Sequence, residues 1–162
     1  MNDCNALLRE VMTQARMLGI PISREIDPCV VVNARAATRF GCCKLQRGKY
    51  IIEVAQRVAQ GPEESCRETI AHEVLHTCWG CRNHGTRWKG YAQRMNEVYG
   101  YHIARVSTDA EMGTKPEKAY KYMLRCKACG MEFGRLRASN LTRHPERYRC
   151  RCGGELEVVQ KS

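Results

Sequence analysis

The chain has 162 residues, enough for one moderate hydrophobic core and a small accessory module. Its formal net charge is +10, and it shows neither a basic segment followed by an apolar run nor an apolar stretch of membrane-spanning length, so we expect no signal peptide and no membrane span. The eleven cysteines are odd in number and come without an export signal, which argues against a secreted disulfide scaffold and indicates thiols or metal ligands in a cytoplasmic protein.

The N-terminal third predicts one helix followed by a small sheet. Leucine, valine and alanine recur at helical spacing over residues 3–18, and Gly19 with Pro21 ends the run. Three short runs rich in β-branched or aromatic residues then predict strands, at residues 29–33, 39–45 and 49–54. Because the last two flank a turn that contains Gly48, we expect at least this pair to be antiparallel.

Two further helices follow. The first begins near Pro62, which suits an initial helical turn, and is expected to end at Gly80. Its apolar stripe, expected to face the core, consists of Cys66, Ile70, Val74 and Cys78. The second spans about residues 86–98 and ends before Gly100. Its predicted buried residues are Trp88, Tyr91 or Ala92, Met95 and Val98.

A polar segment at residues 108–118, with Gly and Pro, predicts a linker and a boundary near residue 114. Residues 1–113 hold 15 Lys+Arg and 12 Asp+Glu, a net +3, whereas residues 114–162 hold 12 and 5, a net +7. The sequence therefore predicts an α+β domain over residues 1–113 and a small basic domain over residues 114–162. A basic field this concentrated favours a polyanionic partner.

The motif H-E-x-x-H occurs in the predicted helix that begins near Pro62. Its i, i+4 spacing places His72 and His76 on one helix face, where both imidazoles can bind one zinc ion. Glu73 can then act as the general base for a metal-activated water that attacks a carbonyl. His84 follows a short turn and can complete three protein ligands, which leaves a fourth position open. An oxyanion-stabilising residue is not assignable, although Arg87 and Tyr91 follow the third ligand.

The C-x-x-C pair of Cys78 and Cys81 allows two alternatives. It could be a thioredoxin-like redox motif, but such a pair sits at a helix N-terminus and Cys78 is expected near a helix C-terminus. It could also join His72 or His76 in a closed, structural metal site. The other cysteines of this domain are interpreted as small apolar residues in or near the core: Cys4, Cys29, Cys42, Cys43 and Cys66. His102 is interpreted as structural.

The C-terminal domain has the spacing of a zinc ribbon. Two cysteine knuckles lie about twenty residues apart and supply four thiolates for a closed tetrahedral zinc site, from Cys126, Cys129, Cys150 and Cys152. The second knuckle, C-x-C-G-G, is one residue shorter than the common form. So small a segment has little core, and we expect metal binding to supply most of its folding free energy.

Basic and aromatic residues alternate between the knuckles. The predicted contacts to nucleic acid are Arg135, Arg137, Arg143, Arg147, Arg149, Arg151, Phe133 and Tyr148. Arginines supply phosphate contacts and aromatic rings supply stacking faces, a combination that favours single-stranded or distorted nucleic acid read with little sequence preference. His144 is interpreted as part of this surface rather than as a metal ligand.

The stretch "HEVLHTCWGCRNHGTRW" resembles the SprT-like zinc metalloproteases, relatives of proteases that cut proteins crosslinked to DNA. Their pattern is H-E-x-x-H, a loop, then H-G and an aromatic residue, matched here by His72, Glu73, His76, His84, Gly85 and Trp88. The aromatic residue is Trp88 rather than the more usual phenylalanine, and the loop is short. The preceding strands "TRFGCCKLQRGKYIIEV" resemble the small sheet of this family, and in zincins an edge strand of such a sheet aligns the substrate backbone.

The resemblance implies a zincin-like metalloprotease domain with a C-terminal zinc ribbon, and with it one catalytic and one structural zinc ion. It also implies a DNA-associated protein substrate and DNA as a partner, and we expect a monomer. Two other functions remain open. One is a non-catalytic zinc-containing nucleic-acid-binding factor, against which the carboxylate of Glu73 argues. The other is a thiol oxidoreductase that acts through Cys78 and Cys81.

Overall fold

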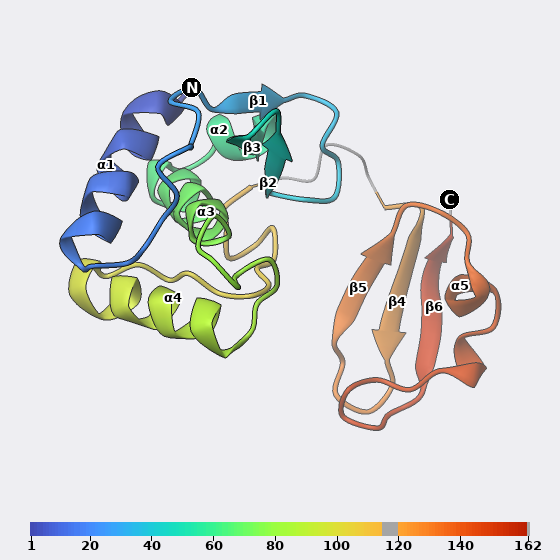
Figure 1. The fold of residues 1–162 in the computed structure, drawn as a ribbon. Helices are drawn as coiled ribbons and strands as arrows, with labels where there is room; N and C mark the ends of the chain where they lie inside the picture. Colours follow the sequence, from blue (N-terminus) through green and yellow to red (C-terminus); the bar gives the residue numbers. More distant parts are fainter. Residues whose placement is uncertain (115–119, 162) are drawn as a thin grey trace. The chain divides into compact units, whose positions relative to one another are not determined.

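The computed structural model describes residues 1–114 and 120–161, so residues 115–118 of the predicted linker lie outside the described residues. The chain divides into two compact units, Met1–Pro116 and Glu117–Ser162, both drawn in Figure 1. Helices and strands occur in both units, which confirms the predicted α+β class. Among the described residues, no helix is both long and apolar enough to cross a membrane.

The N-terminal unit contains four α-helices: α1 (Cys4–Met17), α2 (Gln56–Ala59), α3 (Glu63–Leu75) and α4 (Thr86–Tyr99). The bounds of α1 and α4 confirm the predicted helices, whereas the short α2 was not expected. The predicted extension of α3 to Gly80 is wrong. After Leu75 the backbone closes into tighter i to i−3 bonds, and the Thr77 hydroxyl donates a hydrogen bond to the carbonyl of Val74 at 2.7 Å. Cys78 therefore lies beyond the helix, although it is buried.

A three-stranded sheet lies beside these helices, formed by β1 (Val31–Asn33), β2 (Gly41–Gln46) and β3 (Lys49–Ala55) in the order β1-β3-β2. β2 and β3 pair antiparallel, as predicted, and β1 pairs parallel to β3. The hairpin turns through Arg47 and Gly48, both at positive φ, which suits a tight turn between twisted strands. Because β3 is the central strand of this order, β2 lies at one edge of the sheet. β2 also packs against α3.

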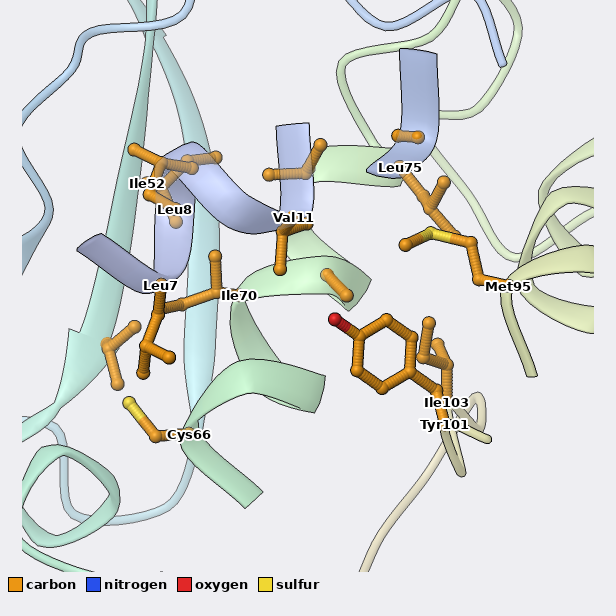
Figure 2. Packing of buried hydrophobic residues seen from close by; sticks show 14 of the residues in the cluster. Leu7, Leu8, Val11, Ile52, Cys66, Ile70, Leu75, Met95, Tyr101 and Ile103 are labelled. Atoms are coloured by element: carbon orange, nitrogen blue, oxygen red, sulfur yellow. The ribbon is translucent and has the colours of Figure 1, made fainter. Parts of the chain in front are cut away.

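The core of this unit lies between α1, α3, α4 and the sheet. Figure 2 shows Leu8 of α1 close to Ile52 of β3, and Leu75 of α3 close to Met95 of α4. Two predictions about burial are wrong. Val98 is 59% exposed, because it lies on the outer face of α4, and Cys29 is exposed in the loop before β1.

The C-terminal unit is a second antiparallel sheet of β4 (Tyr122–Cys126), β5 (Glu132–Arg135) and β6 (Leu156–Lys161), in the order β5-β4-β6. A short α5 (Asn140–Arg143) and a 3-10 turn (Pro145–Arg147) lie between β5 and β6. Its core is small. The buried cluster consists of Cys126, Cys150 and Leu156, with Phe133 and Leu141 packed against it.

Candidate metal centres and their surroundings

Three histidine side chains converge at the end of α3. His72 lies in its last turns, His76 is the residue that ends it, and His84 lies where the chain returns toward α4. The Nε2 atom of His84 is 2.8 Å from that of His72 and 3.2 Å from that of His76. The sequence-predicted ligands are thus brought together, and their ligand atoms lie within 4.8 Å of one another.

Backbone carbonyls fix the tautomers of the two helical histidines. His72 Nδ1 lies 3.0 Å from the carbonyl oxygen of Ala104, and His76 Nδ1 lies 2.6 Å from that of Cys81. A carbonyl only accepts hydrogen bonds, so each Nδ1 carries the proton and each Nε2 presents a lone pair. Such second partners orient metal-bound histidines in proteins.

Bare lone pairs that face one another repel unless a cation lies between them. Tetrahedral zinc with bonds of ~2.0–2.1 Å would hold nitrogen ligands about 3.3 Å apart. The 3.2 Å between His76 and His84 is close to this separation, and the 2.8 Å between His72 and His84 would have to widen slightly. Burial, followed by the neighbouring imidazoles, lowers the pKa of His72 to about 4, so this ring is neutral at pH 7. The three donors therefore fit a zinc ion.

Trp88 supports all three imidazoles from one side. Its ring centroid lies 4.7 Å from that of His72, 5.7 Å from that of His76 and 4.6 Å from that of His84. The side chain is only 1% exposed, and its Nε1 is buried without a hydrogen-bond partner among the described residues. The buried indole thus packs against all three imidazole rings and limits their movement.

Glu73 lies beside the histidines and is 8% exposed. Burial raises the pKa of its carboxyl to about 8, although a hydrogen bond from the backbone N–H of Cys43 and the charge of Arg39 act in the opposite direction. On β2, a Cβ at Gly41 would stand 2.9 Å from both Cγ and Oε1 of Glu73. The carboxylate is therefore held between α3 and the outer strand of the sheet.

A cavity of about 260 Å³ opens at this position. Thr69, His72 and Glu73 of α3 line one side, and the segment that leads into β2 lines another. Residues 102–107, which follow α4, also line the cavity, together with Glu68 and Met112. The cavity thus lies between His72 and Glu73 on one side and the outer strand β2 on the other. An extended peptide could approach the edge of such a strand.

Cys78 and Cys81 are buried and belong to no metal-ligand group in residues 1–114. The closed site with His72 or His76 is therefore not what the structure shows. Burial raises the pKa of Cys78 to about 12 and also raises that of Cys81, the opposite of the shift that activates a redox thiol. The pair instead anchors the turn between the second and third histidines.

The four C-terminal cysteines form a second group, with ligand atoms within 4.8 Å of one another. Cys126 Sγ lies 3.5 Å from Cys152 Sγ, and Cys129 Sγ lies 3.7 Å from Cys150 Sγ. Tetrahedral zinc with Zn–S bonds of ~2.3 Å separates thiolates by about 3.8 Å, so this set also fits zinc. In the short second knuckle, a Cβ at Gly154 would lie 2.6 Å from Cys126 Sγ, and Gly153 adopts a positive φ of 88°, so both positions favour glycine.

All six arginines that the sequence marks for nucleic-acid contact are exposed, and so is Tyr148. Phe133 is half-buried against the small core, and the guanidinium of Arg135 lies 5.1 Å from its ring centroid. Arg149 also faces Glu155, at 3.8 Å. The surface is basic, with Tyr148 as its exposed ring.

Several neighbours of the histidine centre carry no local signal in the sequence. The carbonyls of Ala104 and Cys81, the N–H of Cys43 and the missing side chain of Gly41 act through the backbone, and only the fold brings them to α3. His102 is exposed and its Nδ1 lies 3.2 Å from Glu68 Oε1.

Comparison with known families agrees with this geometry. A family model described as the SprT-like family matches residues 10–110, which are 101 of the 162 residues and include all three histidines and Glu73. A search among curated proteins finds no significant match.

Proposed function

Because the chain belongs to the SprT-like family, we propose that its N-terminal unit is a zinc-dependent endopeptidase. The observation that carries this proposal is the convergence of three imidazole Nε2 atoms beside the buried carboxylate of Glu73, on a cavity bordered by an outer strand. A purely structural metal site has no need of an adjacent carboxylate or of an open cavity.

The three histidines would hold the ion, through the lone pairs that Ala104 and Cys81 leave free on His72 and His76. Zinc bound there would lower the pKa of a coordinated water and polarise the carbonyl of a peptide bond. The positive charge of a bound ion would offset the effect of burial and favour the ionised form of Glu73. In that form Glu73 would accept the proton of the attacking water and could return it to the leaving amine. The N–H of Cys43 orients this carboxylate, and Trp88 keeps the rings in place.

The substrate would bind as an extended segment along β2. This strand lies at the edge of the sheet order β1-β3-β2, so its outer side has no neighbouring strand among the described residues, although the N–H of Cys43 already bonds to Glu73. Gly41 and Phe40 line the cavity together with His72 and Glu73, so a peptide added to this edge would pass the metal ligands.

The C-terminal unit would be a zinc ribbon that binds DNA, in single-stranded or distorted form. Its exposed arginines and the ring of Tyr148 supply phosphate contacts and a stacking face. The substrates would accordingly be proteins bound or crosslinked to DNA, and the ribbon would concentrate the peptidase near them.

The test combines zinc content with cleavage. We would measure zinc per chain and DNA-stimulated proteolysis for the wild type, for Glu73→Gln and for the His72→Ala/His76→Ala double variant. We expect two zinc ions in the wild type and in Glu73→Gln, one in the double variant, and cleavage only in the wild type. Glu97→Gln, at an exposed position on α4, is the matched control. Full cleavage by Glu73→Gln would overturn the role of Glu73 as general base, and a zinc-loaded wild type without cleavage would leave a non-catalytic DNA-binding factor.

A further inference from the structure

The turn between the second and third histidines presents an exposed tryptophan. The chain has only two tryptophans, and they differ sharply: Trp88 is 1% exposed, whereas Trp79 is 82% exposed. The buried thiols of Cys78 and Cys81 anchor the two sides of the turn, and Gly80 adopts a positive φ of 73° at its tip. The fold thus holds Trp79 out into solvent on a fixed turn rather than on a loose loop.

An arginine covers the indole and is itself fixed. The guanidinium carbon of Arg87 lies 4.6 Å from the ring centroid of Trp79, and its Nη1 donates a hydrogen bond to the Trp79 carbonyl at 3.2 Å. Arg87 belongs to the first turn of α4, so the pair bridges the turn and the helix. Two flat cationic and aromatic groups are therefore already ordered side by side, which lowers the entropic cost of binding a third flat group.

The surroundings are positive and polar. Residues 74–96 contain Arg82, Arg87, Lys89 and Arg94 and no Asp or Glu. The side chains of Arg82, Arg87 and Lys89 are exposed. Lys89 is near enough to His84 for its positive charge to lower the pKa of that imidazole. The other exposed residues between 82 and 90 are polar or glycine, so this neighbouring segment adds no apolar side chain of the kind that surrounds a protein–protein hot spot. An aromatic anion complements this surface better than an apolar protein face does.

We propose that the Trp79–Arg87 pair is a stacking site for an unpaired base of single-stranded DNA, with Arg82 and Lys89 as contacts to the neighbouring phosphates. This places a nucleic-acid contact on the N-terminal unit, in addition to the ribbon. It rests on the proposed function only in taking DNA as the polyanion. Stacking of bases on aromatic side chains, flanked by cations, is the usual way in which proteins hold single strands without reading their sequence.

The turn that carries Trp79 also connects two of the three histidines of the metal centre. The same turn supplies the Cys81 carbonyl that orients His76, at 2.6 Å, and leads directly into His84. A base stacked on Trp79 would thus restrain the turn that connects two of the three ligands. DNA bound here would order the metal site in the same step that brings the substrate close.

The test uses the full chain and a fluorescent oligothymidylate. Stacking should quench the emission of Trp79 in the wild type, and the Trp79→Phe variant, which keeps only buried Trp88, should show no such quenching. We expect Trp79→Ala to weaken binding about tenfold and Trp79→Phe clearly less, because phenylalanine keeps a stacking face. Arg82→Ala/Lys89→Ala should reduce the salt dependence of binding by about two phosphate contacts. Arg9→Ala/Arg16→Ala, at exposed positions on α1, is the control.

Four outcomes would overturn the proposal that Trp79 and Arg87 form a stacking site. These are wild-type affinity in Trp79→Ala, quenching that persists in Trp79→Phe, equal affinity for duplex DNA, and tighter binding of oligouridylate than of oligothymidylate. Quenching of Trp79 by a peptide substrate without DNA would assign the surface to protein instead. Zinc content and cleavage in the absence of DNA, measured on the same samples, report separately on the proposed peptidase, so its failure and the failure of this site are distinguishable.

Discussion

Gly41 and Glu73 approach each other so closely that no β-carbon fits between them. A Cβ at Gly41 would lie 2.8 Å from Thr69 Cγ2 and 2.9 Å from the Cγ and Oε1 atoms of Glu73. We predict that Gly41→Ala displaces this carboxylate and lowers cleavage by about 10- to 100-fold, since misplacing a catalytic group by ~1 Å has effects of this size. Zinc content should stay at the wild-type value, because the atoms nearest to the added methyl group belong to Thr69 and Glu73 and not to the histidines. Activity and zinc per chain are measured together.

Gly90 offers the matched control, because a Cβ there would meet nothing within 4 Å and the residue lies inside α4. Gly90→Ala should keep its activity and gain slightly in stability, by up to ~1 kcal/mol. A Gly41→Ala variant as active as Gly90→Ala would mean that the position of Glu73 tolerates the added methyl group and that the contact is not restrictive.

Glu53 should make the unfolding free energy depend on pH. Burial by itself would raise the pKa of this carboxyl, but hydrogen bonds from Lys44, Asn33 and Arg39 outweigh burial and hold the pKa at about 2. A folded pKa below the ordinary 4.5 contributes stability that is present above pH ~4.5 and is lost as the pH falls toward 2. We predict a contribution on the order of 1–3 kcal/mol at pH 7.

The measurement is chemical denaturation of the wild type and Glu53→Gln between pH 7 and pH 2.5. The wild type should be more stable at pH 7, and the difference should shrink as the pH drops through this window. Glu25→Gln, at an exposed position, should show a much smaller difference. A Glu53→Gln difference that stays constant with pH would contradict the assignment of the shift to this carboxyl.

For individual residues of the histidine centre, the sequence predicts the ligands that are close together in the chain but not their distant backbone partners. His72 and His76 are one helical turn apart, and helix periodicity alone puts them on one face. The N–H of Cys43 lies thirty residues before Glu73, and the carbonyl of Ala104 lies 32 residues after His72. These are backbone groups that every residue type carries, so no residue pattern marks them.

At the scale of elements, the start of α4 acts as a support for the metal ligands, and its stiffness depends on Trp88. We predict that Trp88→Ala destabilises the unit by about 3–5 kcal/mol and weakens zinc binding. Trp88→Phe should cost much less, because it keeps a ring under the imidazoles and removes the buried, unpartnered Nε1. Thermal unfolding and zinc affinity would be measured for both, with Val98→Ala on the exposed face of α4 as the control. A Phe variant as damaged as the Ala variant would show that the indole itself is required.

Element boundaries were predictable where apolar periodicity continues and failed where side chains redirect the backbone. α1 was confirmed almost to the residue, since Gly19 and Pro21 stop it. The stripe that continues through Val74 to Cys78 suggested a longer α3, yet the Thr77 hydroxyl bonds to the Val74 carbonyl and the chain turns away. Val98 fits the same helical period as Met95, but its side chain is 59% exposed. The four residues of α2 are too few to show a period.

At the scale of the whole molecule, the two units rely on metal to different degrees. The N-terminal unit has a cluster of 27 buried hydrophobic residues drawn from helices, strands and loops. The corresponding cluster of the C-terminal unit has three, and two of them are the proposed ligands Cys126 and Cys150. A core this small cannot offset the loss of chain entropy, so the free energy of metal binding must supply the difference. The N-terminal unit is already packed, so metal binding to its three histidines is not needed for this unit to fold.

We therefore predict that a chelator unfolds the C-terminal unit and leaves the N-terminal unit folded. Amide hydrogen exchange, resolved by segment, should show loss of protection in β4–β6 and retained protection in α1 and α3 after zinc removal. Cys126→Ser/Cys129→Ser should reproduce this pattern with zinc present, whereas His84→Ala should leave β4–β6 protected and remove one zinc ion. Protection that survives in β4–β6 without metal would mean that Leu124, Leu156 and Phe133 suffice as a core, and the cysteine group would then be dispensable for folding.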